Sequence, residues 1–367
     1  MKLVVPSEIF EGEQRVSITP DCVPSLLKMG FKVYIEKGAG LQSSYTDEDY
    51  KKSGAKISSK LTELYSKANL VIKIQRPTKK GKTNEPNYLK NCSILTLLYE
   101  SKFKNDFDIL KRKKINVFAL EKMPRISRAQ SMDVLSSQSN LSGYKAVIDA
   151  ASEFNKAFPL MMTSAGTVAP AKILVIGAGV AGLQAIATAK RLGAVVFSFD
   201  VRTSTKEQVQ SLGAKFIEVE NEDSGETSAG YAKEMTKSYK KKQNALLAET
   251  LRKIDIVITT ALIPGKPAPK LITKKMLDNM KVGSIIVDLA SEFGGNCEVT
   301  KHGEIIHYKS KKVIGPRNLA ASVAQDSSRL FSKNVVNFLM NSCESGKFKN
   351  FNWDDEVVKE TCVIKNI

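Results

Sequence analysis

The stretch ILVIGAGVAG at residues 173–182 decides the fold. Its first four residues form an apolar run of strand length, and three glycines follow in the spacing GxGxxG. In an α/β unit, Gly177 permits the tight turn, Gly179 lets the backbone approach a pyrophosphate, and Gly182 permits close packing of helix and strand. The stretch therefore predicts a strand, a phosphate-binding loop and a helix whose positive end faces the phosphates.

A carboxylate at the end of the next predicted strand extends this pattern. Asp200 ends the run 195–200, 23 positions after Gly177. A carboxylate there can accept hydrogen bonds from an adenosine ribose and repel a 2′-phosphate, whereas a plain turn aspartate would do neither. Arg202 favours NADP instead, since an arginine nearby can pair with that phosphate. With Asp200 in place, we expect the cofactor to be NAD(H).

Strand-like and helix-like segments alternate along the chain, which predicts parallel sheets covered on both faces. The expected strands are 3–5, 31–36, 70–74, 93–97, 115–119, 172–176, 195–200, 254–259 and 284–288. A helical stretch at 132–158 is expected to lead into a second domain, and a helix at 319–339 to return to the first. We predict an α/β protein of two Rossmann-like, doubly wound parallel-sheet domains separated by a cleft. The first domain would comprise 1–132 and 318–367, and the second 133–317.

Two segments lie outside this alternation. Residues 159–171 contain Met161, Met162, Gly166 and Pro170, and we expect an extended or hairpin excursion there. Exposed methionines in it would suit contact with another subunit, although burial in a strand is the commoner fate. Residues 221–243 mix glycines with many charges and fit neither period, which favours a mobile loop.

The composition excludes several classes of protein. The net charge is +18, with 56 Lys and Arg against 38 Asp and Glu, but it is diffuse and no aromatic stripe accompanies it, which disfavours nucleic-acid binding. Five scattered cysteines without a CxxC pair, and only two histidines, make a metal site or disulfide framework improbable. The most apolar window, 173–189, contains three glycines and is too short to span a membrane. Without a signal sequence at the N-terminus, we expect a soluble, unprocessed protein.

A second block of small polar residues, RISRAQSMDVLSSQSN at 125–140, follows a predicted strand. Composition alone indicates a solvated loop with Ser127 or Ser131 capping a helix. If the block faces a cleft between two domains, its residue types also permit recognition of a carboxamide by Gln130, Asp133 and Ser136. Arg125 would then be available to pair with an anion.

Long runs of the sequence resemble the NAD(H)-binding domain of bacterial proton-translocating transhydrogenase. The runs are PRISRAQSMD at 124–133, GVAGLQAIATAKRLGA at 179–194, DVR at 200–202, GYAKE at 230–234 and TTALIPGK at 259–266. The resemblance covers almost the entire chain. It implies two Rossmann-like domains around a cleft for NAD(H), and a homodimer in which 159–171 forms a contacting hairpin.

The resemblance, together with the glycine loop, also implies which residues bind the cofactor. Around the nucleotide they are Gly177, Ala178, Gly179, Val180, Gly182, Asp200, Val201, Arg202, Gly230, Tyr231, Gln243 and Leu262. At the nicotinamide end they are Arg125, Ile126, Ser127, Gln130, Ser131, Met132 and Asp133.

The mechanism that the resemblance implies is direct hydride transfer from NADH to NADP⁺ carried by a partner subunit. No side-chain acid or base is needed, so the site would act by positioning the two rings. Arg125, Gln130, Asp133 and Ser136 are the candidates, with Gln130 bridging toward the second nucleotide. Membrane-spanning subunits would translocate protons, and would hold this chain at the cytoplasmic face of the bacterial inner membrane.

Two alternatives remain at this point. A weaker resemblance extends to alanine dehydrogenase, in which the positions of Arg15 and Lys73 hold and activate a keto acid. That enzyme also needs a histidine in the first domain, and residues 97–100 here read LLYE, so we expect Arg15 and Lys73 to be structural. The other alternative is a non-enzymatic, NAD-responsive nucleic-acid binder, which the +18 charge suggests.

Overall fold

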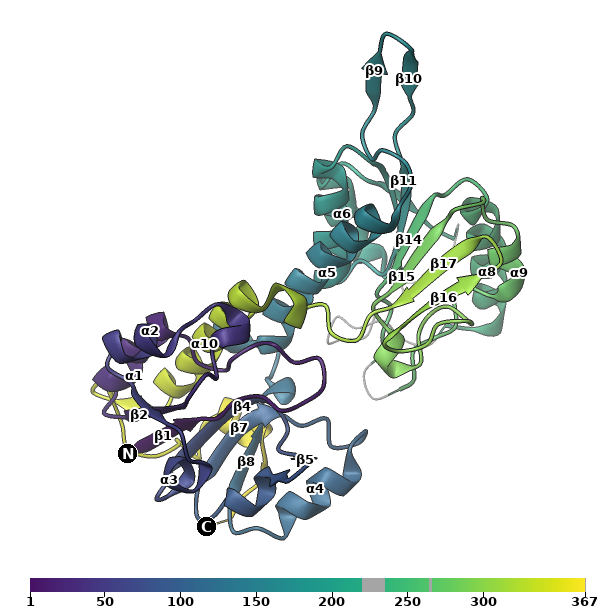
Figure 1. The fold of residues 1–367 in the computed structure, drawn as a ribbon. Helices are drawn as coiled ribbons and strands as arrows, with labels where there is room; N and C mark the ends of the chain where they lie inside the picture. Colours follow the sequence, from purple (N-terminus) through teal and green to yellow (C-terminus); the bar gives the residue numbers. More distant parts are fainter. Residues whose placement is uncertain (220–234, 264–265, 367) are drawn as a thin grey trace. The chain divides into compact units, whose positions relative to one another are not determined.

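The computed structural model describes residues 1–219, 235–263 and 266–366. The chain divides into two compact units: unit 1 is Met1–Gln138 with Ala320–Ile367, and unit 2 is Ser139–Leu319. The sequence-based expectation put these boundaries at 132/133 and 317/318. In each unit, helices cover both faces of a sheet (Figure 1).

Unit 1 is built on a seven-stranded sheet with the order β20-β8-β7-β4-β1-β2-β3. Its strands are β1 (Lys2–Val5), β2 (Lys32–Glu36), β3 (Lys56–Ser58), β4 (Leu70–Gln75), β7 (Ser93–Leu97), β8 (Asn116–Ala119) and β20 (Cys362–Ile364). Neighbouring strands are parallel except at β20, which runs antiparallel to β8. Because the direction of winding reverses between β1 and β4, helices are laid on both faces.

The helices of unit 1 come from both ends of the chain. They are α1 (Val23–Lys28), α2 (Asp47–Lys52), α3 (Leu61–Tyr65), α4 (Lys104–Lys111), α10 (Ala324–Met340) and α11 (Glu356–Thr361). Alternation along β1 divides the core, since Leu3 and Val5 face the cluster that contains α1 and α10, while Val4 faces the cluster that contains α3 and α4.

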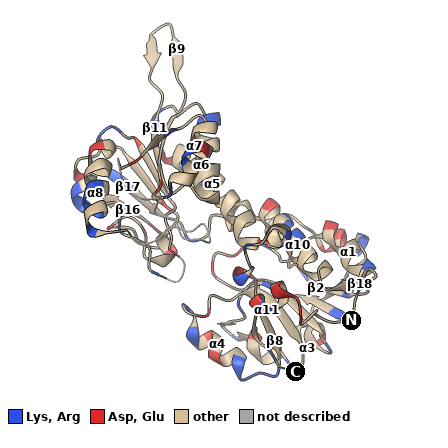
Figure 2. Ribbon diagram, turned by 180° about the vertical axis from the view of Figure 1, so that it is seen from behind, with Lys and Arg blue, Asp and Glu red and all other residues tan. Residues whose placement is uncertain are grey.

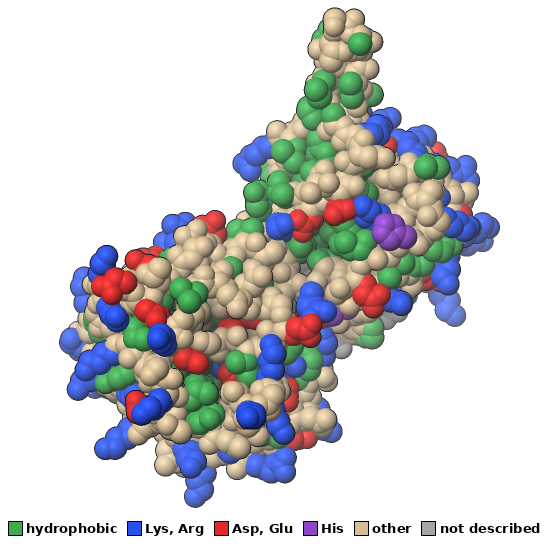
Figure 3. All heavy atoms as spheres, in the orientation of Figure 1, with side chains coloured by type: hydrophobic (Ala, Val, Ile, Leu, Met, Phe, Trp, Pro, Cys, Tyr) green, Lys and Arg blue, Asp and Glu red, His purple; other side chains and the backbone are tan. Residues whose placement is uncertain are grey.

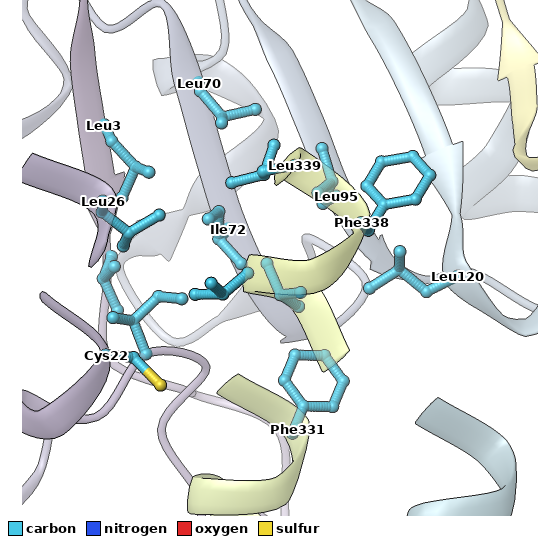
Figure 4. Close-up of a cluster of buried hydrophobic side chains, with 14 of the residues drawn as sticks. Leu3, Cys22, Leu26, Leu70, Ile72, Leu95, Leu120, Phe331, Phe338 and Leu339 are labelled. Atoms are coloured by element: carbon cyan, nitrogen blue, oxygen red, sulfur yellow. The ribbon is translucent and has the colours of Figure 1, made fainter. Parts of the chain in front are cut away.

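Helix α10 completes the first of these clusters from the far end of the sequence. Its apolar residues recur at helical spacing, and Phe331, Phe338 and Leu339 are fully buried. Figure 4 shows these three side chains among Leu3, Leu26, Ile72 and Leu95 of the sheet and α1. The core of unit 1 therefore depends on residues more than three hundred positions apart in the chain.

Unit 2 has the same arrangement of parallel strands as unit 1, but its antiparallel edge strand comes earlier in the chain. Its sheet runs β13-β12-β11-β14-β15-β17-β16. The strands are β11 (Lys172–Ile176), β12 (Val195–Phe199), β13 (Lys215–Ile217), β14 (Ile256–Thr259), β15 (Ile285–Asp288), β16 (Glu304–Tyr308) and β17 (Lys311–Gly315). When only the parallel strands are numbered, each sheet has the order 3-2-1-4-5-6, with one antiparallel strand at the edge beside the sixth. This edge strand follows the sixth parallel strand along the chain in unit 1 (β20 after β8) and precedes it in unit 2 (β16 before β17). The predicted fold class, two doubly wound Rossmann-like sheets, is confirmed.

Among the described residues, five α-helices belong wholly or largely to unit 2. They are α5 (Val134–Glu153), α6 (Val180–Arg191), α7 (Lys206–Ser211), α8 (Lys237–Leu251) and α9 (Lys274–Asp278). Helices α5 and α6 pack closely, because a Cβ on Gly143 would lie 2.1 Å from the carbonyl oxygen of Ala181. Helices α8 and α9 cover the other face with Leu247 and Leu277.

The expectation of a mobile loop at 221–243 is wrong for its last residues, which belong to a helix. Helix α8 begins at Lys237, where the Thr236 side chain accepts a hydrogen bond from the Tyr239 amide. Its buried face contains Tyr239, Gln243 and Leu247, whereas the lysines face solvent. The run of lysines between the buried residues makes their helical spacing hard to recognise in the sequence. Figure 2 shows Lys and Arg gathered along α8. Residues 220–234 lie outside the described part of the chain.

The excursion at 159–171 is the predicted hairpin. Strands β9 (Met161–Thr163) and β10 (Gly166–Val168) pair antiparallel. Met162 is 84 % exposed, and apolar side chains are visible on the projecting hairpin (Figure 3). Among the described residues, no helix combines the length and apolar character needed to cross a bilayer.

We expect Phe338→Ala to destabilise unit 1. Its ring is fully buried and meets Phe118 edge-on, with centroids 5.9 Å apart, so truncation leaves a cavity costing about 3–5 kcal/mol. Trp353, the sole tryptophan, packs against Phe118 and can report unfolding of this unit in denaturant. Met340→Ala on the same helix is the control, since Met340 is 55 % exposed. Equal midpoints for the two variants would contradict the packing described above.

Candidate functional site

The glycine loop of unit 2 lies between β11 and α6, and its geometry requires glycine at two positions. Gly177 has a φ of +99°, and a Cβ there would lie 2.5 Å from Thr260 Oγ1. A Cβ on Gly182 would lie 1.8 Å from the carbonyl oxygen of Gly177. Thr260 Oγ1 in turn donates to that carbonyl at 3.0 Å. The first turn of α6 is therefore held directly against the ends of β11 and β14.

Gly179 differs from its two neighbours in the motif. It is the N-cap of α6 with an ordinary φ of −78°, and no side chain caps the helix there. The nearest heavy atom to a Cβ at Gly179 would be Arg202 Nη2, 3.9 Å away. The fold therefore does not require glycine here. The open space fits a ligand that approaches the amides at the start of α6, as a dinucleotide pyrophosphate does.

Asp200 lies beside this loop, as the motif predicts, but its carboxylate is already engaged by the protein. Oδ2 accepts from the Ala178 amide at 2.6 Å and from Arg202 Nη2 at 2.8 Å. Oδ1 accepts from Arg202 N and Nε at 2.9 and 3.0 Å. A carboxylate offers about four acceptor sites, so a ribose hydroxyl would have to replace one of the Arg202 contacts. The pairing also neutralises Arg202, which weakens its attraction for a 2′-phosphate.

The structure brings most of the predicted nucleotide residues of unit 2 to one edge of the sheet. Strands β11, β12 and β14 are neighbouring and parallel, so Gly177–Gly182, Asp200–Arg202 and Thr260–Leu262 follow their carboxyl ends. Leu262 is 41 % exposed and Val180 42 %. Gln243 is buried on α8. Gly230 and Tyr231 lie outside the described residues.

The predicted nicotinamide residues of unit 1 lie on a short 3₁₀ helix, η5 (Ser127–Met132), and its flanks. Ala129 and Met132 anchor η5 in the core of unit 1. The carbonyl oxygen of Ser131 accepts from Asn334 Nδ2 and Asn337 Nδ2 of α10, at 2.8 and 3.0 Å. Ile126 is partly buried and packs against the same core, whereas Arg125, Ser127, Gln130 and Ser131 are exposed.

Asp133 caps α5, which corrects the expectation that Ser127 or Ser131 would do so. Its Oδ1 accepts from the Ser136 amide at 3.0 Å, and its Oδ2 from the Ser136 hydroxyl at 2.6 Å. An aspartate satisfies an unpaired amide of the first turn as well as a serine does, and here the helix begins after the 3₁₀ segment rather than within it. The cap holds Asp133 and Ser136 together as one rigid polar pair.

Lys73 lies at the carboxyl end of β4 in unit 1 and is fully buried among carboxylates. Its Nζ is 2.6 Å from Glu85 Oε1 and 3.2 Å from Glu8 Oε2. Burial alone lowers the pKa of Lys73, but the charges of Glu8 and Glu85 outweigh burial and raise that pKa above its ordinary value. The ammonium group is therefore paired within the protein.

Arg15 is engaged in the same way. Its Nε and Nη2 each donate at 2.6 Å to Glu13, and its Nη1 donates at 2.6 Å to Gln138 Oε1. Buried charges of this kind are normally paired, and these pairings support the interpretation of Arg15 and Lys73 as structural residues. Sequence reasoning missed all four partners, which are Glu8, Glu13, Glu85 and Gln138. Glu13 lies only two positions from Arg15 and was available as a signal, whereas no local motif connects Arg15 with Gln138, 123 positions away.

Two parallel sheets of order 3-2-1-4-5-6, one of them with a glycine loop at its carboxyl edge, define a protein of the two-domain Rossmann-fold class. Within this class, the chain belongs to the alanine dehydrogenase/PNT family. The family's N-terminal domain matches residues 4–142, and its C-terminal domain matches residues 146–366.

Relatives within the family confirm the resemblance to transhydrogenase. The chain is 50 % identical to the first part of the NAD(P) transhydrogenase subunit alpha of Rhodospirillum rubrum, covering 100 % of this chain and 97 % of that protein. It is 43 % identical to the NAD(P) transhydrogenase subunit alpha of Haemophilus influenzae, covering 100 % of this chain and 71 % of that protein. The structure of transhydrogenase from Sinorhizobium meliloti aligns with a TM-score of 0.90 at 44 % identity, covering 100 % and 99 % of the two chains.

The glycine loop allows a test that separates folding from binding. We expect Gly179→Ala to fold with an unchanged melting temperature, because a Cβ there meets no atom closer than 3.9 Å. It should nevertheless weaken NADH binding by about tenfold or more, since the methyl group occupies the approach to the helix amides. NADH fluorescence titration and thermal unfolding measure the two quantities.

Gly182→Ala is the matched variant for this test. Its Cβ would clash with the Gly177 carbonyl, so we expect it to lose stability rather than only affinity. Wild-type NADH affinity in a folded Gly179→Ala protein would contradict a pyrophosphate site at this loop.

The buried charges of unit 1 predict a pH dependence of stability. Burial is the main cause that raises the pKa of Glu8 from 4.5 to about 7, although Lys73 opposes it. Between these two pH values the folded chain keeps a proton that the unfolded chain releases, so stability falls as pH rises through the window. The contribution is at most about 3 kcal/mol.

The measurement is the free energy of unfolding at about pH 5 and about pH 8 for the wild type and Glu8→Gln. We expect the free energy of unfolding to differ less between the two pH values in Glu8→Gln than in the wild type, because the variant has no carboxyl proton to release at this position. The exposed Glu360→Gln serves as control. An identical pH profile for all three proteins would show that Glu8 does not titrate in this range.

Proposed function

We propose that this chain is the NAD(H)-binding component of a proton-translocating transhydrogenase. In this proposal, hydride passes directly between NAD(H) on this chain and NADP(H) on a partner subunit. The observation that carries the proposal is the full-length similarity to transhydrogenase alpha subunits in a chain whose glycine loop has open space at Gly179. The alanine dehydrogenase alternative has only the weaker similarity, 29 % and 31 % identity to two alanine dehydrogenases.

Unit 2 would hold the nucleotide. The amides at the start of α6 would bind the pyrophosphate, and Asp200 would hold the loop through Ala178 while sharing its carboxylate with the ribose. The pairing of Asp200 with Arg202 favours NAD(H) over NADP(H). Proposed further contacts are Gly177, Gly179, Val180, Gly182, Val201, Gly230, Tyr231, Gln243 and Leu262.

The residues of η5 and its flanks would orient the nicotinamide. NADH supplies the hydride, and transfer to a second nicotinamide requires orientation rather than proton transfer. Asp133 is suited to this role and not to general base catalysis, because both of its oxygens are held by Ser136. Gln130 on η5 and Arg125 just before it are exposed, so that their donors would be available to a carboxamide or to the partner's nucleotide. Ile126, Ser127, Ser131 and Met132 would complete the nicotinamide end of the site.

The proposed assembly contains further chains. The exposed hairpin β9–β10 would contact a second copy in a homodimer, since its apolar residues lack cover within the described chain. An NADP(H)-binding subunit and membrane-spanning subunits would complete the complex, with proton translocation in the latter. This chain would then be peripheral at the cytoplasmic face of the membrane.

Reconstitution tests this function. The purified chain is mixed with a soluble NADP(H)-binding subunit of a transhydrogenase, and reduction of acetylpyridine NAD by NADH is followed in the presence of NADP(H). We expect transfer that requires both proteins and falls about a hundredfold in Gln130→Ala, because a misplaced ring loses the alignment that drives transfer. Gln325→Ala, an exposed glutamine on α10, is the control.

Either of two results would contradict the proposal. One is NADH binding without any transfer in the presence of a competent partner. The other is NAD-dependent oxidation of alanine by the chain alone, which would restore the dehydrogenase alternative.

A further inference from the structure

Gln138, on α5 five residues after the Asp133 cap, uses its whole hydrogen-bonding capacity inside unit 1. Its Oε1 accepts from Arg15 Nη1 at 2.6 Å and from Ser327 Oγ at 2.8 Å. Its Nε2 donates to the Ser327 carbonyl at 3.1 Å and to Ser137 Oγ at 3.2 Å. A glutamine amide has two acceptor and two donor sites, so every site is occupied.

Arg15 makes the shortest of these four hydrogen bonds, and its guanidinium group is itself held by other side chains of unit 1. Glu13 binds its guanidinium through both carboxylate oxygens, and Gln75 Nε2 at the end of β4 donates to Glu13 Oε2 at 2.8 Å. The side chains of Arg15 and Glu13 are almost completely buried, so solvent does not screen the pair. A chain of hydrogen bonds therefore runs from the sheet of unit 1, through Glu13 and Arg15, to Gln138 in the first turns of α5.

The opposite end of the same segment is fixed to α10. Asn334 donates to the Ser131 carbonyl, and its Oδ1 accepts from Ser137 Oγ at 2.7 Å. The chain from Ser131 to Gln138 is thus held at both ends by buried polar groups of unit 1. Asp133 and Ser136, two of the proposed nicotinamide residues, lie between these attachments, and Gln130 lies directly before the first of them.

We propose that Gln138, locked by Arg15 and Ser327, is a positioning residue for hydride transfer. It sets the place of the segment that presents Gln130, Asp133 and Ser136, and it does not touch the nucleotide. This inference rests on the proposed function, because it assigns Gln138 to the same reaction. It also gives the Arg15–Glu13 pair a role as the rigid support of that segment.

The test uses Gln138→Met, which keeps an unbranched side chain of similar length but removes all four hydrogen bonds. We expect the hydride-transfer rate at saturating nucleotides to fall about tenfold or more, since small misplacements of reacting groups are costly. The dissociation constant for NADH should stay within about threefold of the wild type, because Gln138 makes no proposed contact with the cofactor. Gln325→Met is the matched control on the exposed face of α10.

A second variant keeps the test decisive if Gln138→Met does not fold. Ser327→Ala removes one hydrogen bond to Gln138 Oε1 and leaves Arg15 in place, and we expect a smaller loss of rate with unchanged NADH affinity. Trp353 fluorescence in denaturant checks that unit 1 is folded. Wild-type transfer rates in the folded variants, or a loss of NADH affinity as large as the loss of rate, would overturn the inference. Absence of transfer in the wild type would instead overturn the proposed function.

Discussion

The carboxyl edge of unit 2 depends on one close contact, between the backbone of Gly182 and the carbonyl oxygen of Gly177. No side-chain atom fits between them, so the first turn of α6 is held against the end of β11. Thr260, directly after β14, donates a hydrogen bond to the Gly177 carbonyl, and Asp200, directly after β12, accepts one from the Ala178 amide. Three neighbouring strands thereby fix the direction of the helix amides, which is the geometry that an anionic group requires.

Unit 1 has the same order of parallel strands but uses the corresponding edge differently. After its first strand the chain supplies Glu8, Glu13 and Arg15 instead of a glycine loop, and Lys73 joins them from β4. In this buried network Arg15 pairs with Glu13, and Lys73 pairs with Glu85 and Glu8. The same fold thus carries a glycine loop with open space beside it at this edge in one unit and internally paired charges in the other, because site chemistry lies in the side chains and not in the topology.

Local patterns in the sequence predicted the fold class, the strands before and after the glycine loop, the hairpin at 159–171 and the return of the C-terminal helix to the first unit. They could not predict that Asp133 rather than a serine caps α5, because both residue types suit that position. The start of α8 was missed because a run of lysines obscured its buried face. Glu13 is two positions from Arg15 in the sequence, but Gln138 is 123 positions away, and only the fold brings it to Arg15.

The late arrival of α10 in unit 1 has a consequence for synthesis on the ribosome. All of unit 2 lies within residues 139–319, so its core can close while the C-terminal segment is still inside the ribosomal exit tunnel. The core of unit 1 around Leu3, Ile72 and Leu95, by contrast, is not complete until Phe331, Phe338 and Leu339 have left the tunnel. The segment of the chain that is synthesised first is therefore the one whose core closes last.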